Sequence, residues 1–253
     1  MRWVRPELAY VYGEEFLKYD FGPGHPLKPI RLKLTYELSR AKSLFDNDRI
    51  MITPPRVASE RELRLFHSQD YVDFVKKMSK IGHGLLDYGD TPAFKGVFEA
   101  SATAVGASLD AVDAVMNGKA DHGMNISGGL HHAHEDRASG FCVFNDPAVA
   151  IAYMKSKYHL HRIMYLDIDA HHGDGVMFGF YTDPKVLDVD FHEDGRYLFP
   201  GTGFTFETGE KEGEGFKVNF PLPPQTGDEP YLAGFKDIVP KLARSFKPEF
   251  ILV

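Results

Sequence analysis

The stretch Arg162-Ile-Met-Tyr-Leu-Asp-Ile168 is an almost unbroken apolar run, and Asp169-Ala-His-His-Gly-Asp174 follows it directly. An apolar run of this length is typical of a strand that is buried on both faces, as in a parallel sheet. Functional groups in such sheets gather on the loops at the carboxyl ends of the strands. The sequence therefore predicts a buried strand at 162–168 that ends in a cluster of chemically active side chains.

Segments on both sides of this strand alternate between strand-like and helix-like patterns. Helical spacing of apolar residues predicts helices within 30–45, 68–78, 93–116, 145–155 and 232–246, the last with a kink at Pro240. Short apolar runs predict strands at 8–12, 186–191, 217–222 and 249–253. The alternation indicates an α/β fold, a central and mainly parallel sheet with helices on both faces, in a single domain over 1–253.

The composition of the 253 residues is that of a globular protein, with 43% hydrophobic and 26% charged residues. The net charge of -7 and the lack of a basic block give no reason to expect direct nucleic-acid binding. The sequence contains no apolar run of about 18 residues, so it predicts no membrane span. Cys142 is the single cysteine, which excludes an internal disulfide and favours a cytoplasmic location. The oligomeric state is left open.

The motif after the central strand predicts a metal site. Side chains two residues apart in an extended segment point the same way, so Asp167, Asp169 and His171 are expected to face one pocket. A carboxylate with an imidazole suits zinc or ferrous iron, and a catalytic zinc has three protein ligands. Asp169 and His171 are two candidate ligands, and the third must come from elsewhere.

The adjacent His131 and His132 suit acid–base chemistry beside such a metal. The carboxylates of Asp167 and Asp174 are available to orient them. Cys142 as a nucleophile is disfavoured, because the metal motif already explains the site. His134 is left without a role. The isolated histidines are interpreted as structural or surface residues, namely His67, His83, His122, His159 and His161.

Six segments, in order along nearly the whole chain, resemble the zinc-dependent histone deacetylase family. They are Gly24-His-Pro-Leu-Lys-Pro-Ile-Arg31, Phe66-His-Ser-Gln-Asp-Tyr71, Gly128-Gly-Leu-His-His-Ala-His134, Gly140-Phe-Cys142, Asp167-Ile-Asp-Ala-His-His-Gly-Asp-Gly175 and Phe199-Pro-Gly-Thr-Gly203. Gly89-Asp-Thr-Pro-Ala-Phe94 most resembles the bacterial acetoin-utilisation deacetylases. The resemblance implies the arginase/deacetylase fold and hydrolysis of acetyl-lysine.

The resemblance also implies a role for each matching residue. Asp169 and His171 would bind zinc, and His132 with Asp174 would act as general base and acid. His131 with Asp167 would tune the charge near the metal. The substrate would be held by Asp90 in its rim loop, by the Gly140 carbonyl, and by a tunnel lined by Phe141 and Phe199. Taken alone, each phenylalanine would sooner be interpreted as a core residue.

A monovalent cation, usually potassium, also binds in the family that the chain resembles. The matching ligands are Asp167, Asp169, His171, Asp190 and Phe191. Asp190 departs from the family, in which a serine is usual. The extra carboxylate could tighten the cation site, change its ion, or be neutral.

The resemblance covers about the N-terminal two thirds of a deacetylase, because the third zinc ligand and a catalytic tyrosine are expected beyond Val253. The sheet is therefore expected to be incomplete, and this chain alone is expected to have little turnover. The substrate would be an acetylated protein or a small acetylated amine. An acetylpolyamine amidohydrolase and a noncatalytic metal-binding scaffold are the alternative interpretations.

Overall fold

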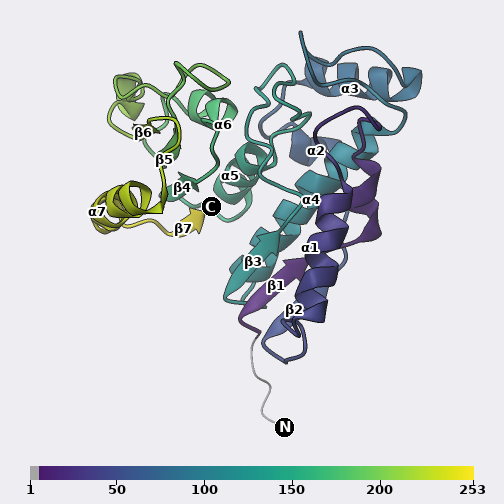
Figure 1. Ribbon diagram of the computed structural model, residues 1–253, viewed down its shortest axis with the longest axis horizontal. Helices are drawn as coiled ribbons and strands as arrows, with labels where there is room; N and C mark the ends of the chain where they lie inside the picture. The colour runs from purple at the N-terminus through teal and green to yellow at the C-terminus, as the bar shows by residue number, and fades with distance from the viewer. Residues whose placement is uncertain (1–5) are drawn as a thin grey trace. The chain divides into compact units, whose positions relative to one another are not determined.

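The computed structural model describes residues 6–253 (Figure 1), which divide into two compact units, the first ending at Met154 and the second comprising Lys155–Val253. Strands and helices alternate along each unit, and all the strand pairs found in residues 6–253 are parallel. Both observations confirm the α/β class that the sequence predicts. None of the helices in the described part of the chain has the length and hydropathy needed to span a membrane.

The first unit contains a three-stranded sheet in the order β2-β1-β3. Its central strand β1 (Leu8–Val11) pairs with β2 (Ile50–Thr53) and with β3 (His122–Asn125). The α-helices of this unit are α1 (Ile30–Ala41), α2 (Glu60–Leu63), α3 (Gln69–Ile81), α4 (Val97–Met116) and α5 (Asp146–Lys157), the last of which extends past the boundary at Met154. Figure 1 shows α1 and α4 running alongside this sheet.

Helix α1 packs on the sheet through a face that its apolar spacing does not indicate. Leu32 is buried, and the Tyr36 ring stacks on Tyr12 of the segment after β1 with 3.9 Å between ring centroids. The regularly spaced Ile30 and Leu34, by contrast, are 49% and 55% exposed. The predicted helix is confirmed, but aromatic stacking selects its buried face.

The second unit contains a four-stranded sheet in the order β6-β5-β4-β7. Its strands are β4 (Ile163–Asp167), β5 (Val186–Glu193), β6 (Lys217–Leu222) and β7 (Phe250–Leu252), and its α-helices are α6 (Asp174–Gly179) and α7 (Asp228–Phe246). All five residues of β4 are buried, as the apolar run predicts. Phe235, Ile238 and Leu242 of α7 pack on the core of β4 and β5, and the helix continues past Pro240 to Phe246.

Some elements differ from the sequence prediction. The helix expected from residue 93 begins at Val97, because Pro92 is in an antiparallel bridge with Leu85 and the backbone of Gly96, at φ 89°, is left-handed. Strands β2 and β3 and helices α2 and α6 were not predicted. The strands of the second unit lie within one or two residues of the predicted bounds.

Candidate functional site

The carboxyl ends of β4 and β5 bring two buried carboxylates together. Asp167 ends β4 and pairs in register with Asp190 of β5, and both residues are at most 5% exposed. Burial, with the neighbouring charge of Asp167, raises the pKa of Asp190 to about 6. Two acidic side chains in one buried place favour a cation or a shared proton between them.

Asp167 is fixed by its neighbours in the chain. The Tyr165 hydroxyl donates to Asp167 Oδ2 at 2.6 Å, and the backbone N–H of Asp169 donates to Oδ1 at 3.0 Å. The alternation of a strand places Tyr165 and Asp167 on the same face, so their contact follows from the local geometry. The hydrogen bond from Tyr165 orients the Asp167 carboxylate. The hydrogen bond from the Asp169 N–H fixes the backbone of the loop that carries the Asp169 carboxylate.

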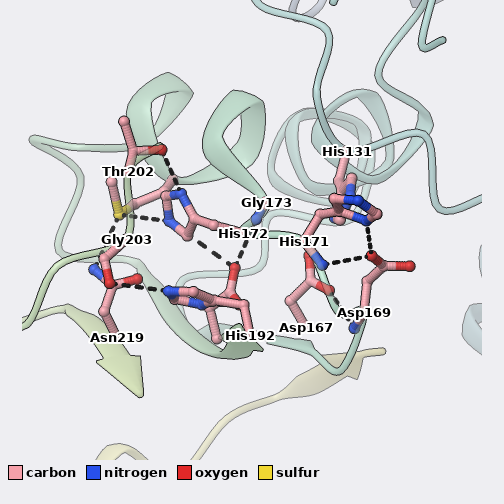
Figure 2. A network of polar contacts seen from close by, with 12 residues as sticks. His131, Asp167, Asp169, His171, His172, Gly173, His192, Thr202, Gly203 and Asn219 are labelled. Atoms are coloured by element: carbon pink, nitrogen blue, oxygen red, sulfur yellow. Dashed lines mark hydrogen bonds and ion pairs between the residues drawn. The ribbon is translucent and has the colours of Figure 1, made fainter. Parts of the chain in front are cut away.

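Asp169 and His171 lie in contact on the loop that follows β4. Asp169 Oδ1 is 2.9 Å from His171 Nδ1, and it also accepts the backbone N–H of His171 at 2.7 Å (Figure 2). Their side chains are 53% and 42% exposed, so a solute ion can reach them. A carboxylate beside an imidazole is a donor set that suits zinc. Residues 6–253 contain no group of three or more His, Cys, Asp or Glu side chains placed to hold a metal.

A buried polar network lies behind this loop. His192 Nδ1 is 2.6 Å from Asp190 Oδ1, and its Nε2 is 2.9 Å from the Gly203 carbonyl. His172 Nδ1 is 2.8 Å from Thr202 Oγ1, and the ring centroids of His172 and His192 are 4.8 Å apart (Figure 2). Gly203 is required here, because a Cβ atom would lie 2.2 Å from His192 Nε2. The network fixes Asp190 and the segment that ends in Gly203.

His131 and His132 form a buried pair in the first unit. Their Nε2 atoms are 3.1 Å apart, and each residue is 5% exposed. One imidazole must donate and the other must accept in such a contact, so the pair can move a proton between two nitrogens. The loop before the pair requires glycine at Gly128, because a Cβ atom would lie 2.4 Å from Asp146 Oδ2.

Two of the residues expected to hold a substrate in the first unit, Gly140 and Phe141, have left-handed backbone conformations. Gly140 and Phe141 both have positive φ, at 53° and 69°, and a positive φ is uncommon for phenylalanine. The Tyr19 hydroxyl donates to the Phe141 carbonyl at 2.7 Å, and the Phe141 N–H donates to Thr91 Oγ1 at 3.1 Å. The rim residue Asp90 is exposed, and its carbonyl lies 2.9 Å from a ring nitrogen of His25.

The predicted site residues divide between the two units. His131, His132, Asp90, Gly140 and Phe141 belong to Met1–Met154, and the other predicted residues belong to Lys155–Val253. Within the second unit, Phe199 lies near His171 with ring centroids 6.4 Å apart, Asp174 is buried at the start of α6, and Phe191 is in the core. The pairing of His131 with Asp167 and of His132 with Asp174 joins the two units and stays a prediction.

Sequence reasoning missed several residues that support the site. His172 was visible beside His171, but His192, Tyr165, Asn145 and Asp146 received no role. Asn145 and Asp146 could have been suspected from their place at the start of a predicted helix, where Asn and Asp side chains bind backbone N–H groups.

The fold and the site define an α/β protein in which histidines and carboxylates gather at the ends of parallel strands. A family model described as "Histone deacetylase domain" matches residues 25–253. The chain belongs to this family.

Known relatives agree with this assignment. The chain is 44% identical to the acetoin utilization protein AcuC of Bacillus subtilis and 42% identical to that of Staphylococcus aureus strain MRSA252. Each alignment covers 96% of this chain and 64% of the relative, so the chain spans just under two thirds of these relatives. Among solved structures, an HDAC homolog from Aquifex aeolicus superimposes with a TM-score of 0.86 at 32% identity. That match covers 97% of this chain and 67% of the other.

Proposed function

We propose that the chain carries the active-site residues of a metal-dependent amidohydrolase that removes acetyl groups from acetylated lysine. The observation that carries this proposal is the contact of Asp169 with His171 at the end of a buried parallel strand. The two side chains would hold zinc, although ferrous iron suits the same donors. Zinc bound there would supply a Lewis acid for the acetyl carbonyl and for the attacking water.

The chain's own residues would then move the protons. His132 would take a proton from the water and return one to the leaving lysine amine, with Asp174 orienting its ring. His131, paired with Asp167, would tune the charge beside it. The buried contact between the two imidazoles supports this role, because one of its two nitrogens is unprotonated and is an atom that can take up a proton.

The remaining roles concern the substrate. Phe141 and Phe199 would line a tunnel for the acyl-lysine stem, the Gly140 carbonyl would accept the substrate amide, and Asp90 would bind the substrate backbone. An apolar tunnel favours the neutral acetylated side chain over the charged product amine, because desolvating an ammonium group is costly. The exposure of Asp90 and the fixed backbone of Phe141 support this assignment.

We further propose a potassium site formed by Asp167, Asp169, His171, Asp190 and Phe191. The buried Asp167 and Asp190, adjacent in register, support it, because carboxylate oxygens are the donors that hard cations prefer. The reaction is proposed to take place in the cytoplasm, where the single Cys142 would stay reduced.

Acetate release from an acetyl-lysine peptide and from acetylputrescine tests the proposal, measured with zinc-loaded protein in which this chain is extended by the third zinc ligand and the tyrosine that the resemblance implies, because this chain alone is expected to have little turnover. Release from the peptide that is lost in His132→Ala and retained in the exposed control His83→Ala would support it. A strong preference for acetylputrescine would favour the polyamine alternative. Zinc binding without release from either compound would favour a noncatalytic scaffold. A protein that neither binds zinc nor releases acetate would contradict the lysine deacetylase, the polyamine amidohydrolase and the metal-binding scaffold alike.

A further inference from the structure

Asn145, just before helix α5, reaches the backbone on both sides of His132. Its Nδ2 donates to the His131 carbonyl at 2.9 Å and to the Ala133 carbonyl at 2.8 Å. Asn145 is fully buried, so water does not compete for these two bonds. The His131 carbonyl belongs to the peptide group directly before His132, and the Ala133 carbonyl belongs to the second peptide group after it, so fixing both limits the rotation of the backbone there.

The orientation of this carboxamide is set by its other contacts. Asn145 Oδ1 accepts the backbone N–H of Ala148 at 2.9 Å, as expected of an N-cap residue at the start of α5. A flipped carboxamide would place its oxygen against two carbonyl oxygens and its NH2 against an N–H group. The surrounding groups therefore allow only one placement of the carboxamide oxygen and nitrogen. In this placement both Nδ2 hydrogens of Asn145 donate to carbonyls of the loop that carries the histidines.

The next residue, Asp146, holds the other end of the same loop. Asp146 Oδ1 accepts the Leu130 N–H at 2.9 Å, and Oδ2 accepts the Gly129 N–H at 3.3 Å and the Ser108 hydroxyl at 2.5 Å. Asp146 is 2% exposed. Two adjacent side chains at the start of α5 thus bind the loop from Gly129 to Ala133 at four backbone positions.

We propose that Asn145 is a positioning residue, which sets the direction of the His132 imidazole through the two carbonyls that it binds. The contact between His131 Nε2 and His132 Nε2 at 3.1 Å depends on this direction, because a hydrogen bond weakens steeply once its distance and angle are lost. The relevance of this positioning to catalysis rests on the proposed role of His132. The positioning itself is a property of the first unit, and it is measurable without turnover.

The test compares Asn145→Asp and Asn145→Ser with Tyr71→Phe in the full chain. Aspartate and serine both cap helices well, so each variant keeps an acceptor for Ala148 but lacks the NH2 group. Tyr71→Phe is the matched control. It removes a buried hydrogen bond of 2.7 Å to the carbonyl of Val143, two residues before Asn145, and leaves the loop from Gly129 to Ala133 untouched.

The readout is the set of imidazole nitrogen resonances in chain labelled with 15N-histidine, with His131→Gln and His132→Gln used only to assign the signals. We expect the His131 and His132 resonances to move in both Asn145 variants and to stay in place in Tyr71→Phe, while circular dichroism shows α5 retained. Unmoved resonances in a folded Asn145 variant would overturn the proposal, as would equal movement in Tyr71→Phe. Should Asn145→Asp fail to fold, Asn145→Ser decides. A chain that releases no acetate can still pass this test, so its failure is distinct from failure of the proposed function.

Discussion

Asp190 Oδ1 lies 2.6 Å from His192 Nδ1, and both side chains are at most 2% exposed. Because His192 Nε2 faces the Gly203 carbonyl, which only accepts, that nitrogen must carry a proton. The remaining proton lies between Asp190 and Nδ1. The two residues thus form a buried pair in which each satisfies the other.

Removing one partner of this pair should be strongly destabilising. We expect His192→Ala to lower the free energy of unfolding by about 3–5 kcal/mol, because it leaves the Asp190 carboxylate buried without its imidazole. The double variant with Asp190→Ser should lose clearly less than the sum of the two single variants. Urea unfolding of all four chains at fixed potassium concentration measures the coupling. Additive losses would show that the pair contributes nothing beyond packing.

His67 should make the stability of the chain depend on pH. It is 2% exposed, its Nε2 accepts the Asn145 N–H at 2.9 Å, and burial lowers its pKa from 6.5 to about 4. The unfolded chain therefore binds more protons than the folded chain between pH 6.5 and 4. Stability attributable to His67 is present above pH 6.5 and is lost as the pH falls, by roughly 3 kcal/mol in total.

Denaturant unfolding at several pH values, for the native chain and for His67→Gln, measures this loss. The glutamine variant should show a shallower fall in stability between pH 6.5 and 4. The exposed control His83→Gln should follow the native curve. Parallel curves for the native chain and His67→Gln would assign the acid sensitivity to other groups.

The sequence predicts the centre of the second unit well, because a strand buried on both faces needs a continuous apolar run. Strand β4 is such a run, and the acidic and imidazole side chains follow it as predicted. Strand β3, with the sequence His-Gly-Met-Asn, has no such signal. It is a strand because its backbone pairs with β1, and that pairing depends on residues more than 100 positions earlier.

The site was predictable where one short segment carries it, as for Asp169 and His171. It was not predictable where distant segments meet. The bonds from Asn145 to the histidine loop span 12 and 14 residues, and the bond from Tyr19 to Phe141 spans 122. Residue type alone does not reveal such bonds, because Asn and Tyr have many other roles. The isolated His67 was read as structural, which its full burial supports.

At position 141 we expect glycine to give a more stable chain than alanine, the reverse of the order found at most positions. The φ of Phe141, 69°, lies in the left-handed region, where glycine is unstrained and a residue with a Cβ atom is disfavoured by roughly 1 kcal/mol. Both Phe141→Gly and Phe141→Ala lose the ring contact with His25, whose centroid lies 4.5 Å away. We expect the glycine variant to be the more stable of the two in thermal unfolding. An alanine variant of equal or greater stability would show that the loop relaxes to a negative φ.

Zinc should stabilise the chain through Asp169 and His171. A ligand that binds only the folded state raises the free energy of unfolding by about 2.7 kcal/mol at 100 times its dissociation constant. We therefore expect zinc to raise the thermal midpoint of the native chain and a chelator to reverse the change. His171→Ala and Asp169→Ala should each remove the response, because each deletes one of the two side chains in contact at 2.9 Å. His161→Ala, which deletes an exposed histidine of the same unit, should keep it. A zinc response that survives in both site variants would place the metal elsewhere in the chain.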